Sequence, residues 1–203
     1  MIQIIQAAGW PIYPIILCSI VALGIIGERF YSLRHSVVAP EGLLNQILQA
    51  HKTNSLSTTK ISELAENSLL GHVLVAGLEN SEHSREIMRE SIEEAGRAVA
   101  QELTKFLTTL GTIATMAPLL GLLGTIIGMI EIFGASSESG LTDPGRLAHG
   151  ISIALYNAAF GIIVAVPALV FYRHFRSKAD SLVVEMEIQA IKLVEIVHGE
   201  RKA

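Results

Sequence analysis

Two polar side chains, Thr125 and Asn157, interrupt the apolar parts of this 203-residue chain and are the first candidates for chemistry. Polar groups within a membrane are costly, so they usually face a protein interior or a water-filled path. A threonine hydroxyl can bond a carbonyl of its own helix, whereas an asparagine amide is not fully satisfied in that way. Asn157 therefore fits two roles equally, a hydrogen-bonded contact between helices and a position on the wall of a pore.

Small residues surround Thr125 in the sequence. Gly124 and Gly128 are four residues apart, and Gly121 lies near the same helical face. This spacing allows helix backbones to approach closely in lipid, where apolar burial no longer drives association. Pro118 removes one backbone hydrogen bond and predicts a kink in the same helix. The segment is therefore expected to pack against another helix.

A second stripe of small residues runs through the segment that holds Asn157 and comprises Ala154, Ala158, Gly161, Ala165 and Ala168. Asn157 lies on one flank of this stripe, and Ser152, Tyr156 and His149 lie on the other side of the helix. The stripe fits ordinary packing within one hairpin, and it also fits the packed wall of an oligomeric channel.

Groups that catalysis or metal binding would need are missing from these apolar segments. None of the segments carries Asp, Glu, Lys or Arg away from its ends, and no His/Cys cluster has metal-ligand spacing. We therefore expect no enzymatic activity, metal or cofactor. A carboxylate that binds a transported ion must come from another chain. The net charge of −4 gives no basic face for nucleic acid.

Three long uncharged stretches must position these residues: Met1 to Gly27, Phe106 to Ile130 and Leu147 to Tyr172. The chain is 50% hydrophobic and only 17% charged, and each stretch can cross the ~30 Å hydrocarbon layer as a helix of roughly 20 residues. The first has no basic residue ahead of it and no small-residue cleavage pattern, so a retained span is expected, about Trp10 to Ile26.

The basic residues set the expected orientation. None precedes the first span and one lies in 131–146, against eight in 28–105 and six in 173–203. The positive-inside rule then places the N-terminus in the periplasm and the C-terminus in the cytoplasm. Glu28, Arg29, Arg173 and Arg176 mark the inner ends of spans and are expected to anchor the chain at the headgroups of the lipid bilayer.

The expected fold is an all-α membrane protein with three transmembrane helices. No proline falls between Ser84 and Ala117, so the second span should continue a long cytoplasmic helix, and the third should run on as an amphipathic helix to His198. A short periplasmic loop is expected from Gly134 to Gly145. The expected divisions are 1–27 (periplasmic N-terminus and first span), 28–105 (cytoplasmic helical domain), 106–172 (membrane hairpin) and 173–203 (cytoplasmic helix).

Three segments resemble the ExbB/TolQ biopolymer-transport proteins, relatives of the flagellar stator protein MotA. They are Pro118–Gly128 with its Gly-Leu-Leu-Gly-Thr core, Gly150–Ala168, and the pair Glu28-Arg29. The resemblance covers nearly the whole chain, and three spans rather than four favour the ExbB/TolQ branch. It also adds Pro167 to the residues expected at helix contacts.

The resemblance implies a subunit of a proton-driven motor in a bacterial inner membrane. Five copies would surround the single spans of two ExbD- or TolR-like partners, whose membrane aspartate takes up and releases protons beside the second and third spans. The motion would pass to a TonB- or TolA-like protein. Energising TonB-dependent uptake at the outer membrane is the preferred interpretation and a Tol-Pal subunit is the alternative, with H⁺ or Na⁺ as the ion.

This chain departs from the family pattern at two positions. Ile153 replaces a glutamate common in the third span, and Ala158 replaces a threonine that usually follows it, whereas Thr125 is kept. The proton-binding group is therefore expected on the partner. The channel wall would then comprise Thr125, Asn157, Tyr156, Ser152, Ile153 and Ala158. A non-conducting scaffold is the competing hypothesis, and a small transporter is disfavoured because matching halves are missing.

Overall fold

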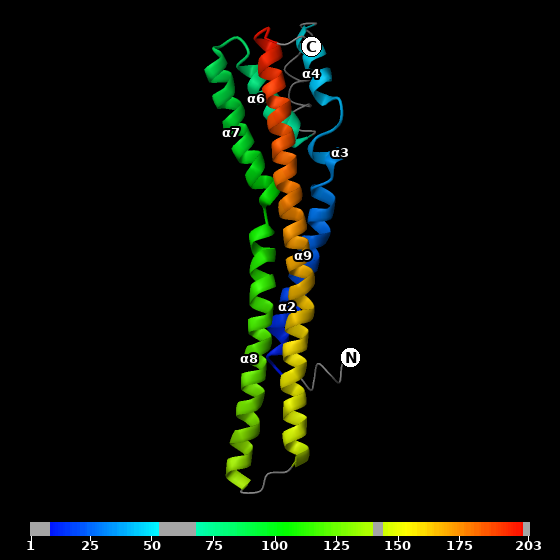
Figure 1. The fold of residues 1–203 in the computed structure, drawn as a ribbon, viewed down its shortest axis with the longest axis vertical. Coiled ribbons are helices and arrows are strands. Elements are labelled where there is room, and N and C mark those ends of the chain that lie inside the picture. The colour runs from blue at the N-terminus through cyan, green and yellow to red at the C-terminus, as the bar shows by residue number, and fades with distance from the viewer. Residues whose placement is uncertain (1–8, 53–67, 140–143, 201–203) are drawn as a thin grey trace. The chain divides into compact units, whose positions relative to one another are not determined.

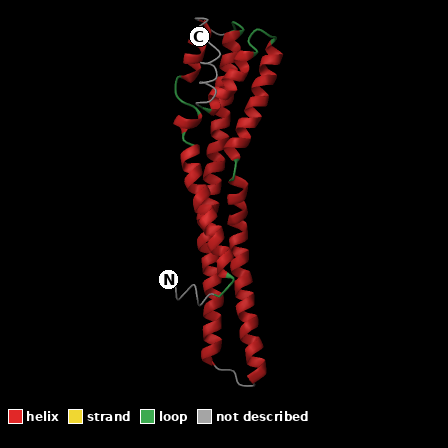
Figure 2. Cartoon of the chain, turned by 180° about the vertical axis from the view of Figure 1, so that it is seen from behind, coloured by secondary structure: helices red, strands yellow, loops and turns green. Residues whose placement is uncertain are grey.

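The computed structural model describes residues 9–52, 68–139 and 144–200, and every regular element within them is an α-helix (Figures 1 and 2). The all-α fold class is therefore confirmed. The elements in chain order are α2 (Ile12–Ser32), α3 (His35–Val38), α4 (Leu43–Lys52), α6 (Leu69–Glu79), α7 (Arg85–Thr104), α8 (Leu107–Ser139) and α9 (Pro144–Val197).

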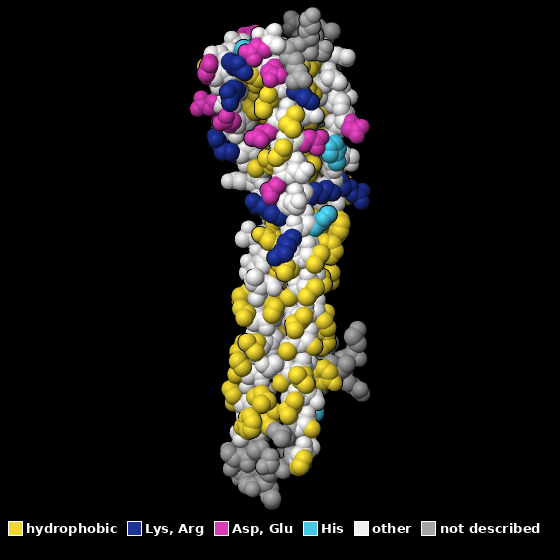
Figure 3. All heavy atoms as spheres, viewed as in Figure 1, with side chains coloured by type: hydrophobic (Ala, Val, Ile, Leu, Met, Phe, Trp, Pro, Cys, Tyr) yellow, Lys and Arg dark blue, Asp and Glu magenta, His cyan; other side chains and the backbone are white. Residues whose placement is uncertain are grey.

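The helices form two units. One, here called the hairpin unit, takes residues up to Glu28 together with Phe106–His174; the other, the charged unit, takes Arg29–Lys105 and the chain from Phe175 onward. Figure 3 shows apolar side chains over the hairpin unit and the Lys, Arg, Asp and Glu side chains gathered on the charged unit.

Three helical stretches are long and apolar enough to cross a membrane, which confirms the three expected spans. They are Ile12–Ser32, Arg85–Gly134 and Ala148–Val197. In the most apolar 18 residues of each stretch, only 28%, 33% and 28% of the residues, respectively, are buried within the chain. Most of this apolar surface must therefore be covered by lipid or by other chains, as expected of an integral membrane protein.

The second stretch is interrupted, so the expectation of a continuous helix from Ser84 into the span is wrong. Helix α7 ends at Thr104, and α8 begins at Leu107. Between them Phe106 has a φ of 60°, which lies in the left-handed region that non-glycine residues rarely adopt. The N–H of Leu110 donates to the carbonyl of Phe106 at 3.0 Å, so the new helix starts directly after the break.

The third stretch has no such break. Helix α9 runs for 54 residues and includes Pro167, far beyond the roughly 20 residues that a span needs. At the other end of the hairpin, α8 continues to Ser139, so the loop expected from Gly134 is helical for its first residues. Residues 140–143 of that loop lie outside the described part of the chain.

The core of the charged unit follows the expected helical stripes. Buried residues recur along α7 and along the last turns of α9, where the stripe comprises Ala179, Leu182, Met186, Ala190 and Leu193. Helices α6 and α7 pack as a hairpin, and a hydrogen bond fixes it: the Ser91 hydroxyl donates to the carbonyl of Ala76 at 3.0 Å. Asn80, which caps α6, donates to Ser91 at 3.1 Å.

Candidate functional site

The backbones of helices α8 and α9 come into contact at two glycines. A Cβ atom added to Gly121 would lie 2.7 Å from the backbone oxygen of Asn157, and one added to Gly161 would lie 2.6 Å from that of Ala117. Real Cβ atoms essentially never come so near, and backbone cannot swing aside as a side chain can. The two backbones are therefore in direct contact at this level, as the small-residue spacing predicts.

The contact continues as an antiparallel series along both helices. A Cβ on Gly111 would meet the ring of Tyr172 at 3.2 Å, and one on Gly128 would rest against Ala154 at an ordinary 3.7 Å. Gly121, Gly124, Gly128 and Gly161 are all buried in this series. Of the two prolines expected at helix contacts, Pro118 lies against Gly161 and Pro167 is exposed.

Asn157 lies inside this contact. Its side chain is fully buried, and its Cβ and Cγ atoms come within 2.7 Å of where a Cβ of Gly124 would be. The amide nitrogen donates to the carbonyl of Ile153, one turn earlier, at 3.2 Å. The asparagine thus fills the room that the missing side chain of Gly124 leaves. Of its two possible roles, this placement favours the contact between helices.

Thr125 lies beside that contact and is half-buried. Its hydroxyl donates to the carbonyl of Leu122 at 2.6 Å, so the hydrogen is used within its own helix. The threonine borders a shallow hollow on α8 that is otherwise lined by Ile126, Met129, Ile130, Phe133 and Gly134. Across the hairpin, Ala158 packs its backbone against Gly121, one turn of α8 before Thr125.

The remaining residues expected on the channel wall do not gather around Thr125. Tyr156 is 39% exposed, and Ser152 is exposed with its hydroxyl donating to the carbonyl of Ala148 at 2.9 Å. Ile153 and Ala158 are half-buried. A single chain therefore carries these six residues on different faces of the hairpin, and a common path past them would have to be completed by neighbouring chains.

A row of hydroxyls on α8 was not singled out in the sequence. Thr108, Thr112 and Thr115 are all exposed on one face, where Thr112 donates to the carbonyl of Thr108 and Thr115 to that of Thr112, each at 2.9 Å. Their spacing of four and three residues is the helical signal that could have revealed them. They bring polarity to the first turns of α8, next to the break at Phe106.

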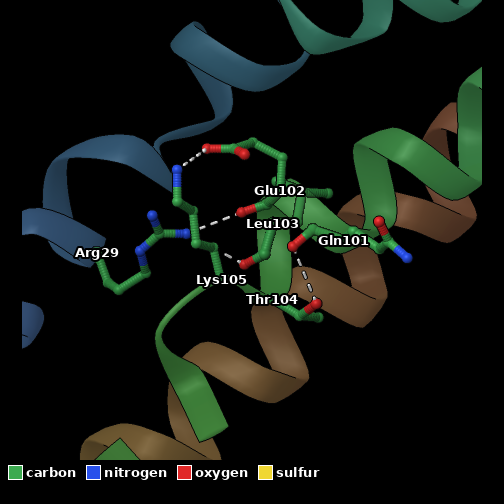
Figure 4. A network of polar contacts seen from close by, with 6 residues as sticks. All are labelled: Arg29, Gln101, Glu102, Leu103, Thr104 and Lys105. Atoms are coloured by element: carbon green, nitrogen blue, oxygen red, sulfur yellow. Dashed lines mark hydrogen bonds and ion pairs between the residues drawn. The ribbon is translucent and has the colours of Figure 1, made fainter. Parts of the chain in front are cut away.

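Arg29 does not lie as a headgroup anchor would. Its guanidinium is only 3% exposed and donates to the carbonyls of Glu102 at 3.1 Å and Leu103 at 3.3 Å (Figure 4). These carbonyls belong to the last turn of α7, where no following turn of the same helix supplies the usual N–H donors and where a cation is favourable. Lys105 adds an exposed ion pair with the Glu102 carboxylate at 3.4 Å.

The other three residues expected at headgroups are exposed: Glu28, Arg173 and Arg176. Arg176 also pairs with Asp180, one turn later, at 3.4 Å. Elsewhere in the described ranges, no group of three or more His, Cys, Asp or Glu side chains is placed to hold a metal ion.

The sequence has clear relatives. Residues 65–188 match the model of the family described as the MotA/TolQ/ExbB proton channel family. The biopolymer transport protein exbB1 of Vibrio cholerae is 29% identical over 91% of this chain and 83% of its own length. The putative biopolymer transport protein ExbB-like 3 of Synechocystis is 31% identical over 85% of this chain and 83% of its own length. The biopolymer transport protein ExbB of Aquifex aeolicus is 28% identical over 70% of this chain and 94% of its own length.

Proposed function

Since the chain belongs to the MotA/TolQ/ExbB proton channel family, we propose that it is the inner-membrane channel subunit of an ExbB–ExbD type motor. The motor uses the proton motive force to energise TonB-dependent uptake at the outer membrane. The N-terminus lies in the periplasm, and the charged unit lies in the cytoplasm. A Tol-Pal role uses the same machinery with a TolR-like partner and a TolA-like output.

The observation that carries this proposal is a tight hairpin whose spans lack a carboxylate away from their ends. The spans hold no carboxylate away from their ends, and the family glutamate position is a half-buried isoleucine, Ile153. A proton path along this hairpin therefore needs a carboxylate from a partner span, which an ExbD-like aspartate supplies. Five copies around two such partners share two aspartates, so each hairpin would meet an aspartate only in turn.

Within this arrangement Thr125 is the residue of α8 that faces the moving carboxylate. Its hydroxyl hydrogen is held by Leu122, which leaves the oxygen lone pairs directed outward as acceptors. A protonated aspartic acid can donate to such an oxygen, whereas an ionised one cannot. The threonine would thus hold the neutral form of the partner group on its way past the wall.

The test is proton flux in liposomes that contain this chain with its ExbD- or TolR-like partner. Thr125→Val should reduce flux at least several-fold, because valine keeps the shape and removes the acceptor, and Thr125→Ser should retain it. Growth on a siderophore as sole iron source should follow the same order, because it reports the TonB-linked output.

A matched control is Thr104→Val. The Thr104 hydroxyl makes the same kind of bond to its own helix, to the carbonyl of Ala100 at 2.9 Å, but it lies in the charged unit. Its substitution should leave flux unchanged. Flux that persists without the partner aspartate and ignores Thr125→Val would contradict the pore assignment, whereas assembly with the partner but no flux would favour the non-conducting scaffold.

A further inference from the structure

The break between α7 and α8 is confined to two residues. Lys105 is extended, with a φ of −52° and a ψ of 141°, and Phe106 has the left-handed φ of 60°. Thr104 before them and Leu107 after them are both helical. The amide of Lys105 donates to the carbonyl of Glu102 at 3.3 Å, a tight turn that ends α7. A change in the dihedral angles of these two residues would therefore continue the helix from α7 into α8.

The local sequence favours that uninterrupted helix. Proline is absent from residues 85–117, and both lysine and phenylalanine occur inside helices at little or moderate cost. In the left-handed region, by contrast, the Cβ atom of Phe106 comes close to the following carbonyl oxygen, which strains the backbone. The break must therefore be stabilised by a contact from elsewhere in the chain.

Arg29 supplies such a contact at the acceptors that a continued helix would use. Its Nη1 atom donates to the carbonyl of Glu102 at 3.1 Å and to that of Leu103 at 3.3 Å, within the charged unit (Figure 4). In an uninterrupted α-helix the same two carbonyls accept from the amides of Phe106 and Leu107, four residues later. The guanidinium and the next turn of helix therefore compete for the same two acceptors.

We propose that the joint between α7 and α8 is a two-state element for which Arg29 is the latch. With the guanidinium on the two carbonyls, the break persists. When the guanidinium leaves, residues 102–109 continue as helix, which relieves Phe106. Because a charged group that is only 3% exposed needs its hydrogen bonds, Arg29 must move to water when it lets go.

The latch lies on a different helix from the joint that it controls. Arg29 belongs to the last turn of α2, so the end of α2 decides whether the last turn of α7 stops or continues. This inference concerns the backbone alone and does not depend on the proposed channel role. Losing the latch costs the bonds of Arg29, and the helix that forms recovers only part of that cost.

Residue-resolved amide hydrogen exchange of the full chain in detergent micelles tests the latch. The first amides of α8, at Leu107, Thr108 and Thr109, have no preceding turn of their own helix to bond. Arg29→Met removes the donors and keeps an unbranched apolar side chain. It should slow exchange at these three amides about tenfold, because the continued helix supplies the carbonyls of residues 103–105 as acceptors.

The matched control is Arg34→Met. Arg34 is also an arginine near the end of α2, but it is exposed and lies over the ring of Tyr31 at 5.6 Å. Its substitution should leave exchange at the three amides unchanged. An equal slowing in Arg34→Met would show that loss of any nearby positive charge is enough, and it would overturn the latch.

A second substitution separates the latch from the simple loss of a helix cap. Glycine adopts the left-handed region without strain and disfavours a helix interior. Phe106→Gly added to Arg29→Met should therefore return the three amides to the wild-type rate. Arg29→Lys, which keeps the charge on a compact donor, should give an intermediate rate. Unchanged or faster exchange in both Arg29 variants would overturn the latch, as would slowed exchange that Phe106→Gly does not reverse.

Discussion

The glycines Gly121 and Gly161 allow the backbones of α8 and α9 to come into contact. Gly121→Ala places a methyl group 2.7 Å from the backbone oxygen of Asn157, and such overpacking typically costs about 1–3 kcal/mol. Gly128→Ala meets only an ordinary contact of 3.7 Å. Both changes gain the same helix propensity, so their difference in unfolding free energy, measured by SDS titration in detergent micelles, isolates the clash. Equal stabilities would mean that the backbones are not in contact at Gly121.

Arg29 is a second position where one side chain decides local structure. Arg29→Ala removes the donor to two carbonyls at the end of α7, which should cost about 2 kcal/mol. Lysine should recover only part of this, because it lacks the planar fork of arginine. Arg34 is exposed, so Arg34→Ala is the control. The readout is amide hydrogen exchange at residues 102–106, and a rate unaltered by Arg29→Ala would contradict the capping role.

At the scale of elements, the sequence predicts what repeats and misses what depends on a distant contact. The spans and the apolar stripes of α7 and α9 follow from composition and period, and the glycine pattern predicts the close hairpin. The break before α8 has no local signal, because Lys105 and Phe106 are ordinary helix residues without proline or glycine nearby. The side chain that binds the carbonyls at the end of α7 is Arg29, which lies more than seventy residues earlier in the chain.

The break itself yields a prediction at Phe106. A side chain in the left-handed region costs about 1 kcal/mol, which glycine avoids. Phe106→Gly should therefore be more stable than Phe106→Ala by about 1 kcal/mol, the reverse of their order inside a helix. Thermal unfolding of both variants in detergent makes the comparison, and the alanine variant controls for loss of the phenyl ring, which is 47% exposed. If alanine were the more stable, Phe106 would be helical in solution.

The site was predictable only as a set of residue types. Asn157 could be named from the sequence as a polar group at depth, but its place against Gly124 depends on the register between two helices. Arg29 could be placed at the end of a span, yet its burial depends on where α7 ends. In both cases the missing information is tertiary, because a side chain's neighbours are chosen by packing that a single helix does not encode.

For the whole molecule, the proposed orientation can be measured with a membrane-impermeant maleimide on intact cells. In a Cys18→Ala background, Ala148→Cys should be labelled from outside, and Glu90→Cys only after the inner membrane is permeabilised. Both positions are exposed in the folded chain, so access to the reagent depends on the membrane. Labelling in the opposite pattern would invert the topology.

The uninterrupted course of α9 has a consequence for the backbone at the unit boundary. Two of the three chain segments that join the units, α2 and α9, pass the boundary as unbroken helix, and the third leaves the helical conformation at Phe106. Helical hydrogen bonding therefore continues through two of these segments and is interrupted in the third, between Thr104 and Leu107.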